Sequence, residues 1–143
     1  MKQVLLIASS VAASALSHSA SAADVTVQLT DVRPGGGQIR AVLCVAGEDF
    51  PNSCKRTNVT PAMAGTTQVV FKDVAPGSYA FAAYRDANGN GKLDLAGGIP
   101  KESIAFSNNA MGRQGVPSFS ASVFQVGQTG AQLTIKMRRI GAR

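Results

Sequence analysis

The residues whose types and spacing could do chemistry are gathered in one stretch, which runs from Asp86 to Asp94. An EF-hand loop places side-chain oxygens at its first, third, fifth and ninth positions, a glycine at the sixth and a backbone carbonyl at the seventh. This stretch fills that register, with Gly91 at the glycine position. The spacing therefore predicts a weak Ca²⁺ site as the cofactor of this chain. Its ligands would be Asp86, Asn88, Asn90, Lys92 (through its carbonyl) and Asp94.

The EF-hand pattern is incomplete at its end. Gly97 stands at the twelfth position, where an EF-hand loop carries a bidentate Glu. Glu102 could supply a further oxygen from downstream. The alternative is an Asx-rich turn that needs no metal, because Asp and Asn side chains hydrogen-bond to nearby backbone groups. The sequence leaves both interpretations open.

A second polar group of residues follows the loop and is a candidate ligand surface. Hydrogen bonding within the loop is the other use open to these residues. The group consists of Glu102, Ser107, Asn108, Asn109 and Arg113.

The sequence contains few residues in patterns typical of a catalytic site. The one histidine is His18, inside an N-terminal targeting segment, so the rest of the chain has no imidazole. This excludes Ser-His-Asp and Cys-His catalysis and histidine metal sites. A hydrolase using Asp86, Asp94 or Glu102 would need a defined carboxylate separation, so we name no catalytic residue and expect a protein that is not an enzyme.

The N-terminus reads as a signal peptide over residues 1–22. Lys2 gives a positive start, residues 4–16 are apolar or small, and Ala20-Ser21-Ala22 forms a small-x-small cleavage site before Ala23. The mature chain has no later stretch long and apolar enough to span a bilayer. We therefore expect a periplasmic or secreted protein.

The two cysteines, Cys44 and Cys54, are predicted to form a disulfide, because an isolated pair in an oxidising compartment is most simply bridged. Their spacing suits neither a C-x-x-C redox motif nor a zinc knuckle. Closing this short loop would stabilise the fold by about 3 kcal/mol.

Alternation of apolar and polar residues dominates residues 23–143 and predicts short strands joined by Gly/Pro turns. We expect an all-β, two-layer antiparallel β-sandwich as a single domain, with residues 47–65 irregular and one long irregular loop over residues 86–120. The predicted strands cover residues 25–29, 39–45, 67–74, 78–85, 121–126 and 131–139.

Several apolar residues have predicted places in this sandwich. Ile39, Ala41, Leu43 and Val45 are expected on the inward face of their strand, and Tyr79 in the core or at a corner. Phe50 should lie under the disulfide. Phe106 and Phe119 should pin the long loop to the sandwich.

The chain is basic, with a formal net charge of +6, and its basic residues are scattered except at the C-terminus. No aromatic and basic residues interleave in a pattern for stacking nucleic acid bases, so we expect no nucleic acid partner. The partners expected of an exported chain of this kind are an envelope protein or a polysaccharide.

One bacterial family shares a set of motifs with this chain, namely Phe50-Pro51, residues 74–79, 86–94, 98–102, 106–110 and 117–119, and Phe124. The chain resembles that family, which is named domain of unknown function 2141. The resemblance implies an exported sandwich of immunoglobulin-like or transthyretin-like type and no known activity. Arg85 departs from the family, which often has His there, and Ile104-Ala105 replaces a frequent Tyr-Gly.

These features together predict an exported, non-catalytic binding or accessory module whose 86–120 loop forms the recognition surface. The alternative is a structural or protein-interaction protein of the envelope, with a metal-free turn at residues 86–94. A hydrolase is the least supported interpretation.

Overall fold

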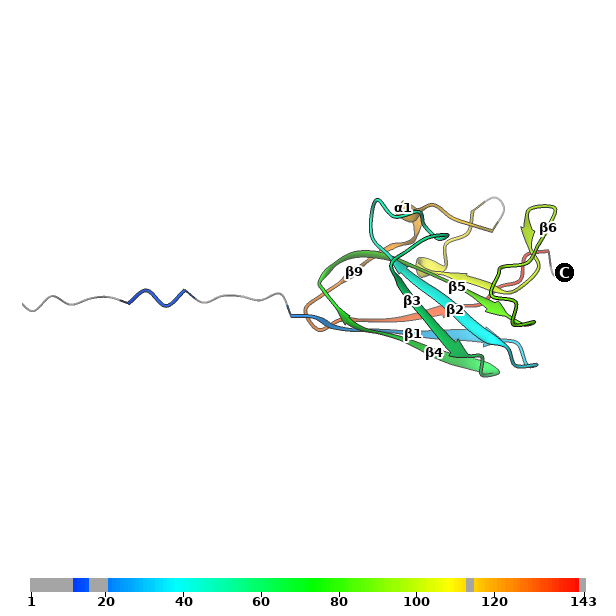
Figure 1. Ribbon diagram of the computed structural model, residues 1–143, viewed down its shortest axis with the longest axis horizontal. Coiled ribbons are helices and arrows are strands. Elements are labelled where there is room, and N and C mark those ends of the chain that lie inside the picture. The colour runs from blue at the N-terminus through cyan, green and yellow to red at the C-terminus, as the bar shows by residue number, and fades with distance from the viewer. Residues whose placement is uncertain (1–11, 16–20, 113–114, 142–143) are drawn as a thin grey trace, which may run out of the picture.

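Strands that alternate apolar and polar residues form two sheets that pack against each other, as the sequence predicted (Figure 1). The computed structural model of the protein describes residues 12–15, 21–112 and 115–141. One sheet has the order β10-β1-β4, made of β10 (Ala131–Lys136), β1 (Ala23–Val32) and β4 (Gly65–Val74). The predicted signal peptide lies mostly outside the described residues and stays a prediction.

The second sheet has the order β3-β2-β5-β8. It consists of β3 (Arg56–Pro61), β2 (Gln38–Cys44), β5 (Gly77–Asp86) and β8 (Ile104–Phe106), and β9 (Val123–Val126) pairs with the first half of β5. Between β5 and β8 lies a small hairpin of β6 (Leu95–Ala96) and β7 (Ile99–Pro100). The described residues also include two short helical turns, η1 (Ser107–Asn109) and α1 (Phe119–Ser122).

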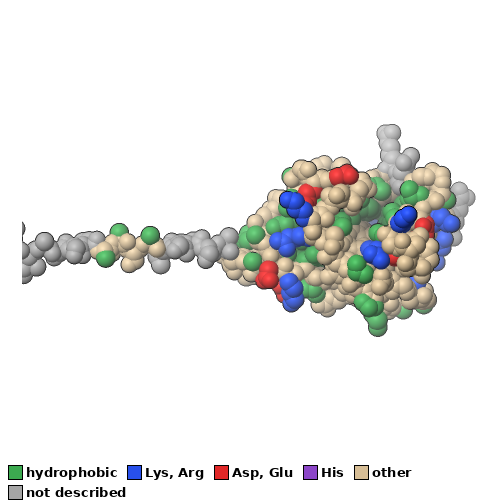
Figure 2. Space-filling model, in the orientation of Figure 1, with side chains coloured by type: hydrophobic (Ala, Val, Ile, Leu, Met, Phe, Trp, Pro, Cys, Tyr) green, Lys and Arg blue, Asp and Glu red, His purple; other side chains and the backbone are tan. Residues whose placement is uncertain are grey.

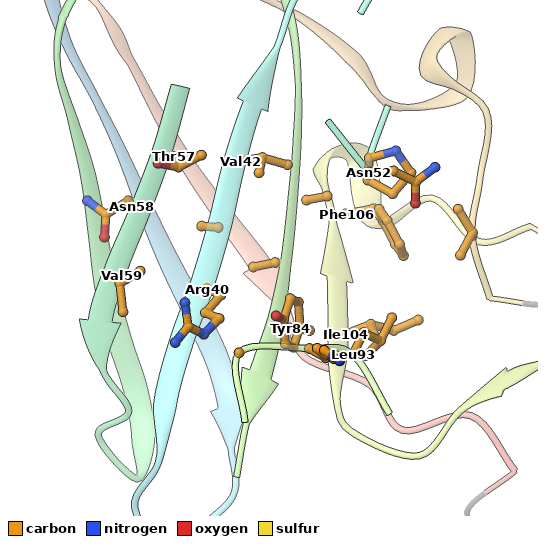
Figure 3. A pocket seen from close by; sticks show the side chains of 17 residues that line it. Arg40, Val42, Asn52, Thr57, Asn58, Val59, Tyr84, Leu93, Ile104 and Phe106 are labelled. Carbon is orange, nitrogen blue, oxygen red and sulfur yellow. The ribbon is translucent and has the colours of Figure 1, made fainter. Parts of the chain in front are cut away.

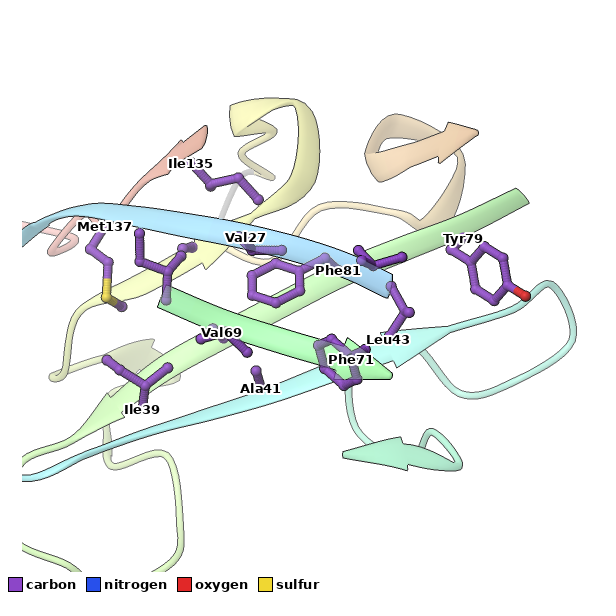
Figure 4. Packing of buried hydrophobic residues seen from close by; sticks show 14 of the residues in the cluster. Val27, Ile39, Ala41, Leu43, Val69, Phe71, Tyr79, Phe81, Ile135 and Met137 are labelled. Carbon is purple, nitrogen blue, oxygen red and sulfur yellow. The ribbon is translucent and has the colours of Figure 1, made fainter. Parts of the chain in front are cut away.

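The core lies between the two sheets and is built by the residues that alternation places inside (Figure 4). Val25, Val27 and Leu29 of β1 are fully buried. The rings of Phe71 and Phe81, from opposite sheets, meet edge to face with centroids 6.2 Å apart. Burial of such side chains is the main favourable term in folding, at about 25 cal/mol per Å² of apolar surface.

Both long sides of the sandwich are linked across the two sheets. On one side, Asn58 of β3 donates a side-chain hydrogen bond to the Val70 carbonyl of β4 at 2.8 Å. On the other, Ile104 and Arg138 exchange two backbone hydrogen bonds of 2.8 Å each. These links cover parts of the sheet edges, which would otherwise present unpaired backbone groups.

Four details of the predicted fold were wrong. Residues 56–61 form strand β3, which sequence reading missed because its residues on both faces are largely polar. The region 86–120 is not uniformly irregular, because it contains strands β6, β7 and β8. These strands are too short to show a periodicity in the sequence. The first and last strands, β1 and β10, pair in parallel, so the sandwich is not purely antiparallel. Val45 lies beyond the end of β2 and is 40% exposed.

Tyr79 occupies the predicted corner, where it is buried and its hydroxyl donates to the Ala75 carbonyl at 2.7 Å. The disulfide between Cys44 and Cys54 is present, with the two Cα atoms 5.2 Å apart. A disulfide fits a protein that is exported to an oxidising compartment. In the part of the chain that the structure describes, no helix is long and apolar enough to cross a membrane.

The 45–55 loop packs onto the 86–120 region through three aromatic rings. The Phe50 ring contacts Phe106 and Phe119 edge to face, at centroid distances of 6.2 and 6.0 Å. Phe106 is buried in β8 of the second sheet. Phe50 is the ring that joins Phe106 to Phe119. The pinning of the long loop to the sandwich by Phe119 stays a prediction.

Candidate functional site

Asp86, the last residue of β5, is fully buried and organises the 86–94 loop. Its Oδ2 accepts hydrogen bonds from the Arg40 Nε and from the Gly91 backbone amide, each at 2.9 Å. Its Oδ1 accepts from the Asn90 backbone amide at 3.1 Å. Both carboxylate oxygens are thus bonded, and the charge is balanced by the Arg40 guanidinium.

Asp94 closes the other end of the loop. Its two carboxylate oxygens accept from the side-chain amides of Asn88 and Asn90, at 2.8 and 2.7 Å. The side-chain oxygens of these asparagines accept in turn from the backbone amides of Asn90 and Lys92, at 3.3 and 3.0 Å. These are Asx-turn bonds, in which a side chain bonds to the backbone two residues on.

Glu102 lies beside the loop, as the sequence predicted for an oxygen from downstream. Its two carboxylate oxygens accept from the backbone amides of Ala87 and Asp94, each at 3.2 Å. The Lys101 amide donates to the Asp94 carbonyl at 2.8 Å. The hairpin after the loop is therefore tied back onto its start and its end.

This arrangement bears directly on the predicted Ca²⁺ site. Calcium takes six to eight oxygen ligands, yet the asparagine side chains turn their nitrogens toward Asp94. The positive charge beside Asp86 comes from Arg40. The bonds present are those of the metal-free Asx turn, and a cation would require both asparagines to turn. The Ca²⁺ site stays a prediction.

A different trio of ligand-type side chains, Cys44, Glu48 and Cys54, lies close together. It is the one group of three or more His, Cys, Asp and Glu residues near enough to share an ion within the described ranges. Its cysteines form the disulfide, and Glu48 accepts from the amides of Val45 and Lys55 at 2.9 and 3.0 Å. This group therefore braces the 45–55 loop.

The pKa of Asp86 lies below its usual value. Burial of the carboxyl raises the pKa, but the hydrogen bond and the charge of Arg40, with the amides of Gly91 and Asn90, lower it by more in sum. Asp86 is therefore ionised at neutral pH, and its charge holds the loop in this conformation.

Arg40 was not singled out in the sequence, although its guanidinium is the charged partner of Asp86. Its position on β2 is directly opposite Tyr84 of β5, which brings the guanidinium close to the end of β5. One feature of the sequence could have pointed to Arg40: it is a charged residue within the largely apolar strand Gln38–Cys44. Its partner could not be read from sequence, because Asp86 is far along the chain.

Arg85, which departs from the family pattern, has a structural use. Its guanidinium donates to the carbonyls of Gly36, at 2.9 and 2.6 Å, and Pro34, at 3.2 Å. These bonds fix the 33–37 turn against the base of the 86–94 loop.

The predicted ligand surface at 107–109 is occupied by bonds within the chain. Ser107 is buried, accepts from the Phe81 amide at 3.0 Å and donates to the Ser122 carbonyl. Asn108 donates to the Val123 carbonyl at 2.8 Å, and Asn109 accepts from the Lys136 amide at 2.9 Å. These three side chains join η1 to α1, β9 and β10. Arg113 lies outside the described residues.

The outer face of the second sheet carries a groove that sequence reading did not find (Figure 3). The strand register places two rows of side chains on its floor, Val59-Arg40-Tyr84-Ile104 and Thr57-Val42-Ala82-Phe106. Leu93 and Lys92 of the 86–94 loop form one wall, and Pro51 and Asn52 of the 45–55 loop form another. Figure 2 shows this face hollowed between those two loops.

The groove is apolar over most of its floor and polar at one end. Arg40 and Tyr84 lie at that end (Figure 3), and Lys92 of the 86–94 loop also lines the groove. Burial raises the pKa of the Tyr84 hydroxyl; Arg40 lowers it and the carboxylates of Asp86, Glu102 and Asp94 raise it. The phenol is therefore a neutral hydrogen-bond donor at physiological pH.

The fold and this site define a small β-sandwich with a loop-walled groove on one sheet. The chain belongs to the family described as uncharacterized protein conserved in bacteria (DUF2141), whose model matches residues 27–134. No curated protein and no solved structure matches it.

Proposed function

We propose that the protein is an exported, non-catalytic binding module of the periplasm or extracellular space, whose recognition surface is the groove on the outer face of the second sheet. The observation that carries this proposal is the open, mostly apolar floor of the groove, walled by two loops. Concave, mostly apolar sites with a few polar groups are the usual form of a small-molecule site.

The state of the carboxylates supports a binding role over a hydrolase. Asp86, Asp94 and Glu102 each accept hydrogen bonds on both oxygens from groups of the loop or from Arg40. A general acid or base must reach the proton it transfers in a substrate. These three groups instead fix the wall of the groove.

In this proposal the 86–94 loop is a rigid wall that Arg40 braces in place of a cation. We expect the thermal midpoint of the protein to be the same in millimolar Ca²⁺ and in chelator. A midpoint that rises with Ca²⁺ in the wild type, and not in Asp94→Ala, would show that the calcium site predicted from the EF-hand spacing exists. Occupation at about 100 times the Kd adds roughly 2.7 kcal/mol, which such a melt detects.

The groove itself is tested with a neutral apolar fluorophore, N-phenylnaphthylamine, whose emission rises in an apolar site. We expect saturable binding, weakened about fivefold by Val59→Ser, since Val59 is a half-exposed apolar side chain on the groove floor. Met63→Ser is the matched control, because Met63 is exposed and lies outside the groove.

Absence of saturable binding in the wild type would reject the groove as the recognition surface. Recovery of one specific envelope protein from periplasmic extract, together with that absence, would favour the structural or protein-interaction alternative.

A further inference from the structure

We infer that the groove takes a single-chain anionic amphiphile, a free medium-chain carboxylate, with its head at Arg40, Tyr84 and Lys92 and its chain along the apolar floor. This inference deepens the proposed function and rests on it.

The floor has the shape and chemistry for one alkyl chain. Across the sheet, Val59, Tyr84 and Ile104 lie in one row, and Val42, Ala82 and Phe106 continue the apolar surface in the next. Four strands at a spacing of about 4.8 Å span roughly 14 Å. That width leaves room for one alkyl chain that runs from Arg40 and Tyr84 toward the row of Val42, Ala82 and Phe106.

Two apolar side chains that line the groove are about half-exposed. Val59 and Val116 line the groove and are 51% and 43% exposed. An alkyl chain lying on the floor would cover part of both. Exposed apolar surface gathered around a concave site is typical of a binding site.

The charges at the polar end select the head group. Arg40 and Lys92 are the charged residues among the described residues that line the groove, and none of the lining residues is Asp or Glu. The Arg40 charge is shared with Asp86. Lys92 is exposed and takes part in none of the ion pairs found between described residues, so its charge is available to a ligand.

The polar end also offers hydrogen-bond donors. The Arg40 guanidinium donates one hydrogen bond from Nε to Asp86 and one, of 3.3 Å, from Nη2 to Gln38. Its other N–H groups remain for a ligand. The Tyr84 hydroxyl is a further donor beside it. The lining of the groove thus offers guanidinium, ammonium and phenol donors, which favour a carboxylate over a neutral or cationic head.

The test is displacement of bound N-phenylnaphthylamine by three amphiphiles of equal chain length: decanoate, decanol and decyltrimethylammonium. We expect decanoate to displace the probe at a concentration at least about fivefold below decanol, and decyltrimethylammonium to be weakest. Lys92→Glu should weaken decanoate about tenfold and leave decanol unchanged. Lys101→Glu is the matched control, because it changes the net charge by the same amount as Lys92→Glu. Lys101 is exposed and lies outside this groove.

Equal displacement by decanoate and decanol, or equal effects of Lys92→Glu and Lys101→Glu, would overturn the inference while the fluorophore binding still supported the groove. Failure of the fluorophore to bind would reject the proposed function as well. Sedimentation with phosphatidylglycerol vesicles without binding of decanoate would overturn the inference too, because the anionic partner would then be a membrane surface.

Discussion

At the scale of single residues, the Arg40–Asp86 pair decides the conformation of the candidate site. Both groups belong to strands of one sheet, and the 2.9 Å contact draws the start of the 86–94 loop against β2. A buried charge that loses its partner is costly. Change at either residue should therefore disturb the loop and the wall of the groove together.

The pH dependence of stability tests this pair. The pKa of Asp86 is lowered in the folded protein, so its contribution is present above the unfolded-state pKa, which is about 3.9, and is lost as the pH falls through the folded pKa. We expect Asp86→Asn to lower the thermal midpoint by on the order of 5–10 °C at neutral pH.

The difference between the two proteins should begin to shrink below about pH 4, where this carboxyl binds a proton in the unfolded chain, and should vanish once the pH falls below the lowered folded-state pKa of Asp86. The pKa values of Asp24 and Glu48 are lowered as well, Asp24 chiefly by a hydrogen bond from Lys72 and Glu48 chiefly by the Val45 amide. Both groups remain in the variant, so the comparison isolates Asp86. A difference that stays constant down to strong acid would contradict this account.

At the scale of elements, the 33–37 turn and the base of the 86–94 loop fit together at a glycine. Gly37 has a φ of +87°, and a Cβ there would lie 2.5 Å from the Asp86 carbonyl oxygen and 2.9 Å from the Ala87 Cα. Arg85 holds the same turn from the other strand. The close approach lets β2 begin directly beside the end of β5.

Gly37→Ala should therefore destabilise the protein strongly. Gly36→Ala provides the matched control, because Gly36 also has a positive φ, of +70°, but its Cβ would meet nothing within 4 Å. We expect about 1 kcal/mol of destabilisation for Gly36→Ala from the backbone conformation alone, and at least twice that for Gly37→Ala, measured by urea unfolding. Equal effects would mean that the turn moves freely away from the loop.

At the scale of the whole molecule, the two loops that wall the groove are held by different means. The 86–94 loop is held by polar side chains, whereas the 45–55 loop is held by the Cys44–Cys54 disulfide and the Phe50 ring. The groove lies between them. Its shape therefore depends on the disulfide as well as on Arg40 and Asp86.

The exported protein should be two hydrogens lighter than its reduced form by intact mass. The Cys44→Ser/Cys54→Ser double variant should lose about 3 kcal/mol in the chain-entropy model and bind N-phenylnaphthylamine more weakly. Two free thiols in the exported wild type would refute the disulfide. Unchanged probe binding in the double variant would show that the wall keeps its place without the covalent link.

The sequence by itself determined the sandwich class, most strand positions and the disulfide pair. Those features follow from the alternation of apolar and polar residues and from short spacings between residues. Both patterns lie within a single strand or loop. Strand β3 was missed because an edge strand tied by Asn58 needs no apolar period.

Only the tertiary structure decided what the marked residues do. Arg40 meets Asp86 across 46 positions in sequence, and the groove floor takes side chains from four strands whose order no local pattern encodes. The groove exists because of the order of the strands in the sheet and because the loops leave one face of that sheet uncovered. For the same reason, a spacing that suggested a cation could not reveal that an arginine from a distant strand already lies beside the first carboxylate.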